Sequence, residues 1–237
     1  MNLAVLVDII KETDKNWRFI FQSPIHDKLD YLPGQLVQLH ANIPGDTMPV
    51  VRNYSVASWP DGSNNFELII TYLKGGAMSE YLFKYIKIGD EVMFRGPMGI
   101  FTLPDNILDR DIILVSTGSG VSPFRSMVNY LFENEIEFRN IKLFFGTRTQ
   151  EDILYRKELE FLNRQLTNFS FHPVLSQENW DGLEGHVHKH YLNLIDNAET
   201  KPLVYFCGWN IMIEEGRQEL KKRNFEMMKD IRVEIFG

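Results

Sequence analysis

The chain has 237 residues, enough for one large domain or for two small domains that each bury a core. Its 44% hydrophobic and 24% charged residues are typical of a soluble globular protein and exclude a fibrous or disordered chain. The formal net charge of −7 argues against nucleic acid or an anionic membrane as the main partner, because both would repel the protein at long range.

The single cysteine, Cys207, excludes an internal disulfide. It also excludes an iron–sulfur cluster held by this chain alone, since such a cluster takes about four thiolates. The apolar segment 3–10 is short and contains Asp8, so we expect no secretory signal peptide. No apolar run approaches the roughly 18 residues needed to cross a bilayer. These features predict a cytoplasmic protein without membrane insertion.

The sequence from residue 1 to about 104 is typical of a compact all-β domain. Short apolar or alternating runs are separated by turn pairs such as Pro33-Gly34, Asp61-Gly62 and Gly75-Gly76. The expected strands are 3–10, 17–22, 35–40, 66–73 and 91–96. This spacing favours a barrel or a sandwich.

Two segments of this half carry polar chemistry. In Arg52-Asn53-Tyr54-Ser55, strand alternation puts Arg52 and Tyr54 on one face, where a guanidinium can hold phosphate and a ring can cover a flat heterocycle. In the segment from Thr71 to Leu82, glycines precede Ser79 and apolar residues follow at helical spacing, which predicts a short helix with an anion site at its start. An ordinary strand and an ordinary capped helix also explain these two segments.

The central feature of the chain is an apolar strand, 111–115, that runs into the turn Gly118-Ser119-Gly120 and then into a helix. Its continuous apolar run is typical of a parallel strand buried on both faces. Gly118 and Gly120 allow main-chain N–H groups to approach a ligand closely, and Pro123 suits a first helical turn. The usual dinucleotide fingerprint has a third glycine where Pro123 stands, so the turn alone is also compatible with an ordinary strand-to-helix connection.

Beyond a polar linker at 104–110, strands and helices alternate as a parallel sheet requires. The expected strands are 112–116, 141–145, 169–175, 203–207 and 231–235, and the expected helices include 123–138, 153–166 and 211–222. Such sheets bind ligands outside the carboxyl ends of their strands. Thr117, Arg148, Ser176 and the pair Cys207-Gly208 all lie at such ends.

With these residues assembled, the chain resembles the ferredoxin–NADP reductase family of flavoproteins over nearly its full length. Four motifs occur in the family's order. The segments that resemble its two flavin motifs, its nicotinamide-nucleotide motif and its cysteine–glycine motif are Arg52-Asn53-Tyr54-Ser55, Gly76-Ala77-Met78-Ser79, Thr117 to Phe124, and Cys207-Gly208 followed by Met212. The resemblance implies an antiparallel FAD-binding β-barrel over 1–104 and a parallel-sheet α/β domain for NAD(P) over 111–237.

The resemblance also implies residue roles: Arg52 and Ser79 would hold the flavin diphosphate, and Tyr54 would stack on the isoalloxazine. Ser55, Cys207 and Glu234 would form the catalytic polar set beside flavin N5. The implied FAD contacts are Arg52, Asn53, Tyr54, Ser55, Thr71, Gly76, Ala77, Met78, Ser79 and Phe236, the last covering the other flavin face. The implied contacts with the nicotinamide nucleotide are Thr117, Gly118, Gly120, Pro123, Arg148, Ser176, Gln177, Cys207, Gly208 and Met212.

The choice of nicotinamide nucleotide depends on the 2′-phosphate, which Arg or Lys normally meets. Family members that prefer NADPH commonly carry arginine after the serine that Ser176 resembles, whereas this chain has Gln177. We therefore expect NADH rather than NADPH, and Arg148 is the residue that argues the other way. Trp209 stands where the family usually has proline after the cysteine–glycine pair.

A cluster of histidines, His186, His188 and His190, raises a metal hypothesis, because His186 and His190 would share one face of a helix. No cysteine or third ligand set accompanies them. We therefore favour an ordinary polar segment and expect no metal.

The resemblance implies an enzyme that moves a hydride between NAD(P)H and the N5 of tightly bound FAD. It would pass electrons singly to or from a protein such as ferredoxin, flavodoxin or an oxygenase component. Two alternatives stay open: a reductase of free flavin, and a regulatory subunit that binds flavin or nucleotide without turnover. The sequence names neither the physiological acceptor nor the direction of electron flow.

Overall fold

The structure is a computed structural model that describes residues 1–43 and 47–236, and it divides the chain into two compact units. The barrel unit comprises Met1–Thr102 together with Arg125–Tyr130. The nucleotide unit comprises Leu103–Phe124 and Leu131–Gly237. Residues 125–130, in the middle of a helix, thus belong to the barrel unit, whereas the sequence analysis assigned the whole helix to the α/β domain.

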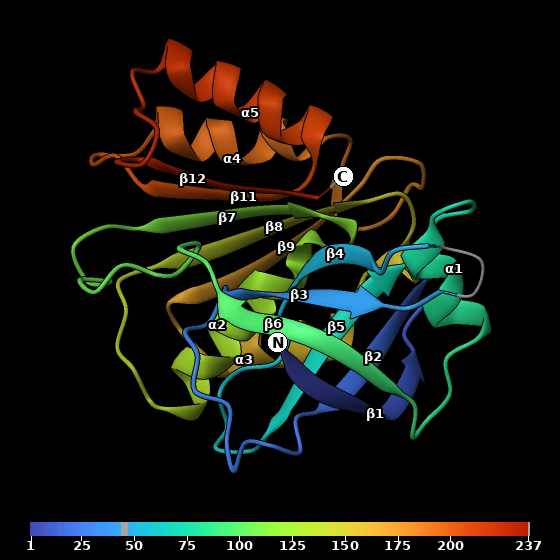
Figure 1. Ribbon diagram of the computed structural model, residues 1–237. Helices are drawn as coiled ribbons and strands as arrows, with labels where there is room; N and C mark the ends of the chain where they lie inside the picture. Colours follow the sequence, from blue (N-terminus) through green and yellow to red (C-terminus); the bar gives the residue numbers. More distant parts are fainter. Residues whose placement is uncertain (44–46, 237) are drawn as a thin grey trace. The chain divides into compact units, whose positions relative to one another are not determined.

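The barrel unit is built on an antiparallel sheet with the strand order β4-β3-β6-β1-β2-β5 (Figure 1). Its strands are β1 (Asn2–Lys11), β2 (Asn16–Gln22), β3 (Leu36–Ala41), β4 (Val50–Ser55), β5 (Asn65–Thr71) and β6 (Glu91–Met98). The two outermost strands also meet, because the N–H of Ala57, just after β4, donates to the carbonyl oxygen of Glu67 in β5 at 2.8 Å. The sheet therefore curls round on itself, which confirms the expected barrel.

The core of the barrel unit is rich in aromatic side chains. Phe21, Phe66 and Phe94 are fully buried, and Phe66 lies 5.5 Å from Phe21 and 5.0 Å from Phe94 between ring centroids. Helix α1 (Ala77–Lys84) adds Met78 and Leu82 to this core, at the i, i+4 spacing that places them on one face. This burial seats α1 against β4.

A buried ion pair is the main polar feature of the barrel unit. The Arg125 guanidinium, on a residue only 4% exposed, donates to the Glu67 carboxylate at 3.1 Å and to the Ala57 carbonyl oxygen at 3.0 Å. Arg18 binds the same carboxylate with two hydrogen bonds of 2.9 and 2.7 Å. A buried charge without a partner is costly. Removing either arginine or Glu67 would therefore destabilise the fold by leaving the remaining charges less well paired.

The nucleotide unit has a parallel sheet with the order β10-β9-β8-β7-β11-β12. Its strands are β7 (Ile112–Thr117), β8 (Ile141–Thr147), β9 (Phe169–Leu175), β10 (Leu183–Glu184), β11 (Leu203–Trp209) and β12 (Ile231–Phe236). Its helices are α3 (Arg156–Gln165), α4 (Val187–Asp196) and α5 (Asn210–Lys222), with the ends of α2 (Ser122–Glu133) and the short turns η1 (Gly118–Val121) and η2 (Gln150–Asp152). Figure 1 shows α4 and α5 on one face of this sheet and α3 on the other.

Two helices are shorter than their periodicity predicted. α2 ends at Glu133 rather than 138, and α3 begins at Arg156 rather than 153. In both places a residue adopts the left-handed conformation, Glu135 with φ 51° and Tyr155 with φ 52°, through which a right-handed helix cannot continue. Among residues 1–43 and 47–236, no helix combines the length and apolar character that crossing a bilayer requires.

Candidate functional site

The glycine-rich turn lies where the strand order of the parallel sheet reverses. β7 has β8 on one side and β11 on the other, and the chain reaches these two neighbours in opposite directions along the sheet. η1 follows β7 directly, at its carboxyl end. In open α/β sheets, ligands bind outside the carboxyl ends of the strands at such a switch point.

Main chain packs directly on main chain at this point. A β-carbon on Gly120 would overlap the carbonyl oxygen of Cys207 and lie 2.7 Å from the Cα of Gly208. Gly208 has φ +138°, and a β-carbon there would lie 2.7 Å from the Thr117 carbonyl oxygen. Both positions therefore require glycine. The first N–H groups of a helix have no acceptor within that helix and can bind an anion. The start of η1, held in place by this packing, is therefore suited to a diphosphate.

A row of polar side chains crosses the sheet two residues before this turn. In the strand register, Ser116 of β7 is paired with Cys207 of β11, and Cys207 with Glu234 of β12, so all three share one face. The Cys207 thiol is fully buried, and burial, assisted by the Glu234 charge, raises its pKa well above the usual value. A thiol held in this protonated form is a poor nucleophile.

Ser116 is a candidate residue that the sequence analysis missed. Its hydroxyl is buried and has no hydrogen-bond partner among the residues that the structure describes. The signal in the sequence was a hydroxyl at the end of an otherwise apolar strand, one residue before Thr117. An orphaned buried hydroxyl at a ligand-binding edge calls for an explanation, which a bound molecule would provide.

The expected nucleotide contacts form two groups. Thr117, Gly118, Gly120, Cys207 and Gly208 meet at the switch point, whereas Arg148, Ser176 and Gln177 lie exposed at the ends of the neighbouring strands β8 and β9. Backbone hydrogen bonds of 3.0 Å join Gln177 to Arg148 and Ser176 to Thr147. The two remaining expected contacts, Pro123 and Met212, have buried side chains.

An acidic residue that the sequence analysis did not single out lies beside Arg148 and Gln177. The Glu178 carboxylate accepts hydrogen bonds from the backbone N–H of Gln150 at 2.7 Å and from its side-chain amide at 2.8 Å. These hydrogen bonds lower the Glu178 pKa below its usual value. A fixed negative charge therefore stands at the ends of β8 and β9.

The expected flavin-ring segment lies in β4 of the barrel unit. Its register pairs Arg52 with Leu39 and Tyr54 with Val37, which puts the guanidinium and the phenol ring on one face, as predicted. Arg52 is exposed and donates to the carbonyl oxygen of its own neighbour Val51 at 2.7 Å. The half-buried Tyr54 has a raised pKa because of its burial, so its hydroxyl stays protonated.

The other members of this segment are in polar contact or buried. Asn53 accepts a hydrogen bond of 3.1 Å from the Gln38 side chain, and Ser55 is buried at the end of β4. Thr71, at the end of β5, donates its hydroxyl to Asn16 at 2.6 Å. The side chain of Phe236 lies outside the described part of the chain.

The expected diphosphate segment begins α1, and Ser79 there is engaged within its own loop. The Ser79 hydroxyl contacts the carbonyl oxygens of Leu73 and Gly76 at 2.9 and 3.0 Å and accepts from the Leu73 N–H at 3.1 Å. Met78 is in the barrel core, and the half-buried Gly76 and Ala77 start the helix. The main-chain N–H groups of this first turn are thus the donors that α1 offers to an anion.

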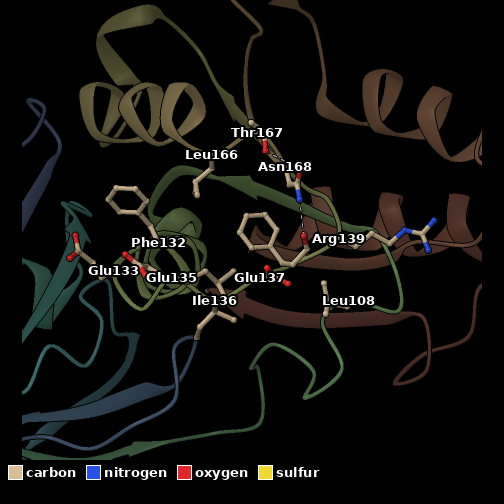
Figure 2. A pocket seen from close by; sticks show the side chains of 12 residues that line it. Leu108, Phe132, Glu133, Glu135, Ile136, Glu137, Arg139, Leu166, Thr167 and Asn168 are labelled. Atoms are coloured by element: carbon tan, nitrogen blue, oxygen red, sulfur yellow. Dashed lines mark hydrogen bonds between the residues drawn. The ribbon is translucent and has the colours of Figure 1, made fainter.

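A separate hollow of about 830 Å³ lies in the nucleotide unit, near the amino ends of β8 and β9 (Figure 2). Asn168 donates there to the Phe138 carbonyl oxygen at 2.9 Å. Three lining residues, Glu133, Glu135 and Glu137, are acidic and would repel a diphosphate. The hollow lies at the amino ends of the strands, whereas the glycine-rich turn lies at their carboxyl ends, so the hollow is not the nucleotide site.

The three histidines around the start of α4 do not converge. His188 Nδ1 is 2.8 Å from the Tyr191 hydroxyl, and His190 Nε2 is 2.9 Å from the Glu184 carbonyl oxygen, while His186 is exposed. Within residues 1–43 and 47–236, no three candidate metal ligands are grouped. Contacts inside the protein therefore account for His188 and His190.

Comparison with known proteins agrees with the two units. Residues 4–103 match the oxidoreductase FAD-binding domain family, and residues 114–218 match the oxidoreductase NAD-binding domain family. A solved structure with a similar fold is the FAD/NAD-binding domain of a nitric oxide dioxygenase from Vibrio cholerae O1 biovar El Tor. It has a TM-score of 0.83 at 19% identity, over 100% of this chain and 98% of that one.

Two curated relatives carry more sequence identity. The electron transfer component of anthranilate 1,2-dioxygenase from Acinetobacter baylyi is 32% identical over 79% of this chain and 53% of its own length. Ferredoxin–NADP reductase B from Sorangium cellulosum is 36% identical over 78% of this chain and 77% of its own length. The chain spans about half to two thirds of the length of the oxygenase reductase components that it matches. Its two matched domains, its fold and its 36% identity to ferredoxin–NADP reductase B show that the chain belongs to the ferredoxin–NADP reductase family of flavoprotein oxidoreductases.

Proposed function

We propose that the protein moves a hydride between a nicotinamide nucleotide and FAD and passes electrons singly to a protein acceptor, such as ferredoxin, flavodoxin or an oxygenase component. The observation that carries this proposal is the main-chain packing of Gly120 on Cys207-Gly208 at the switch point of the sheet. The acceptor class rests on the relatives, one of which is named as an electron transfer component of a dioxygenase.

The barrel unit fits FAD through two features that lie together. Exposed Arg52 and the half-buried Tyr54 ring share a face of β4, and α1 packs against that strand. Arg52 and the main-chain N–H groups that start α1 would bind the diphosphate, and Tyr54 would pack on the ring system. Bound FAD supplies the hydride-accepting N5 and the capacity to release electrons one at a time.

The nucleotide unit contributes position rather than acid–base chemistry. The glycine frame would fix the nucleotide diphosphate, and the Cys207 thiol would pack beside the nicotinamide as a neutral group. Glu234, paired with Cys207 in the register, and Ser55 of the barrel unit complete the proposed catalytic set. Holding reacting groups in place can account for a large part of a rate enhancement without a nucleophile.

We also propose NADH as the preferred co-substrate. Gln177 supplies no charge for a 2′-phosphate, and the Glu178 carboxylate beside it is fixed in its ionised form by Gln150. Arg148 is exposed and opposes the preference, and the charge of Arg156 also acts on the Glu178 carboxylate. The catalytic efficiency with NADH should exceed that with NADPH, and the reverse order would contradict this part of the proposal.

The first experiment is the visible spectrum of the purified protein, before and after anaerobic addition of NADH and then NADPH. We expect flavin absorbance that survives gel filtration and bleaches with NADH. Retained flavin also separates this function from reduction of free flavin. A colourless protein that does not bind added FAD would overturn the proposal, and a flavoprotein that neither nucleotide bleaches would be a regulatory subunit instead.

The role of Cys207 is tested by Cys207→Ala. Because the thiol is buried in the nucleotide unit, FAD content should stay unchanged, while the rate constant for flavin reduction falls by roughly tenfold through lost positioning. Stopped-flow reduction by NADH under anaerobic conditions measures this rate. An unchanged rate constant would remove Cys207 from the catalytic set.

A further inference from the structure

The chain places a large exposed aromatic residue directly at the candidate nucleotide site. Trp209 ends β11 and is 63% exposed, the next residue after the glycine that packs on Thr117. Its backbone is fixed, because its N–H donates to the Thr117 hydroxyl at 3.1 Å. The indole therefore projects from a rigid frame, and exposed tryptophan on such a frame is more typical of a binding surface than of a core.

The indole nitrogen of Trp209 lies beside the glycine-rich turn. A β-carbon on Gly118 would be 3.7 Å from it, an ordinary van der Waals distance, which places the indole in contact range of the turn. Gly118 also has φ +54°, a conformation that glycine adopts without strain. The indole N–H is thus held next to the main-chain N–H groups at the start of η1, where an anion would bind.

The indole N–H has no hydrogen-bond partner among the residues that the structure describes. The contrast within the same unit is Trp180, whose indole N–H donates to the Leu183 carbonyl oxygen at 2.9 Å on a half-buried ring. Trp180 therefore has a structural partner, whereas Trp209 presents a donor to solvent at the site. An indole nitrogen can only donate, so its natural partner is an acceptor such as a phosphate oxygen.

We propose that Trp209 is a positioning residue for the nicotinamide nucleotide: its indole N–H donates to the diphosphate at the glycine-rich turn, and its ring shields that contact from water. This inference rests on the proposed function, since it requires a dinucleotide at the switch point. A hydrogen bond to a charged acceptor is stronger than one between neutral groups, and shielding from water strengthens it further.

The test is the binding of NAD⁺ and ADP-ribose to the FAD-loaded protein, measured by titration calorimetry. Trp209→Phe keeps a ring and removes the N–H, so both affinities should fall by about tenfold, which corresponds to about 1.4 kcal/mol. Trp209→Ala should weaken binding further. Ile211→Ala is the matched control, because Ile211 is a neighbouring side chain, 71% exposed, that has no donor. Its affinities should stay within twofold of the wild type.

A second ligand separates a direct contact from a structural role. Adenosine lacks the diphosphate, so its affinity should be the same in the wild type and in Trp209→Phe. If ADP-ribose binds Trp209→Phe as tightly as the wild type, or if adenosine binding falls equally, the inference is wrong while the proposed function stands. If the wild type binds neither NAD⁺ nor ADP-ribose, the proposed function itself fails, before any variant is compared.

Discussion

In the nucleotide unit, the candidate site is made by main chain packed on main chain, with Gly120 and Gly208 as the residues that permit the contact. In the barrel unit, the candidate site is made by side chains that already bind other parts of the protein, such as Ser79 within its loop and Arg52 on Val51. The first site is preformed by backbone geometry. The second needs a ligand to replace or to join existing hydrogen bonds. Steric changes should therefore damage the nucleotide unit most, and polar deletions the barrel unit.

Gly120→Ala should have the largest effect on the nucleotide unit. Its methyl group would overlap the Cys207 carbonyl oxygen, so η1 and the end of β11 must move apart. Overpacking of this kind costs about 1–3 kcal/mol, and we expect NAD⁺ affinity to fall by about 100-fold, or about 2.7 kcal/mol. Titration calorimetry measures the affinity, and urea unfolding measures the stability.

Gly185→Ala is the matched control in the same unit. Gly185 has φ +91° and no atom within 4 Å of an added β-carbon. It should cost about 1–2 kcal/mol of backbone strain while leaving NAD⁺ affinity unchanged. Equal affinities of Gly120→Ala and wild type would show that the packing at the switch point is not what forms the site.

Arg125→Met should be the most damaging polar deletion in the barrel unit. It removes one partner of the buried Glu67 carboxylate and leaves the Ala57 carbonyl oxygen without this donor. Breaking a buried pair costs about 3–5 kcal/mol, and we expect the lower figure because Arg18 still binds Glu67. The free energy of unfolding in urea measures it.

The surface counterpart is Arg156→Met. Arg156 binds Glu160 at 2.8 Å, but both side chains are about two fifths exposed, so the loss should be about 0.5 kcal/mol or less. If the two substitutions had similar effects, burial would not be what makes the Arg125 network important.

Ser79→Ala should lower the stability of the FAD-free protein by about 1–2 kcal/mol, which is less than the loss expected for Arg125→Met. The hydroxyl ties Leu73 and Gly76 together, and its removal leaves the Leu73 N–H without this acceptor. FAD affinity should fall because the loop that starts α1 loosens. If the stability of the FAD-free protein stayed unchanged while FAD affinity fell, the hydroxyl would instead bind the diphosphate directly.

The sequence predicted both sheets because their signals are local. Alternating runs marked the barrel strands, and the apolar run before Gly118 marked a buried parallel strand, as the structure confirms. Helix ends were less predictable, since the left-handed conformations of Glu135 and Tyr155 leave no mark in the apolar pattern. The two-residue strand β10 was missed because it is too short to show any period.

The candidate sites were predicted as sets of residues, but their partners were not. Glycine spacing identified Gly118 and Gly120, whereas the carbonyl group that Gly120 packs against comes from a strand nearly 90 residues later in the chain. The Arg125–Glu67 pair likewise joins α2 to β5 across 58 residues of sequence. Glu178 was identified as a site residue only from the hydrogen bond that it accepts from Gln150 in the structure. Long-range contacts of single polar residues have no periodic signal from which to predict them.

The last prediction concerns the pH dependence of stability and the face of the nucleotide sheet that α4 and α5 cover. Burial lowers the pKa of His188, and also that of His172, below the usual histidine value, so the folded state favours their neutral forms. The unfolded chain binds protons near pH 6.5, and therefore the free energy of unfolding should fall as the pH drops through that value toward the folded pKa. One histidine contributes a slope of at most about 1.4 kcal/mol per pH unit. Thermal unfolding at pH 7.5 and 5.5 measures the fall, which His188→Gln should reduce. His186→Gln should change it less, because His186 is exposed and its charge is only a lesser cause of the lowered His188 pKa. A fall of the same size in His188→Gln would mean that His188 is not the group whose protonation opposes the fold.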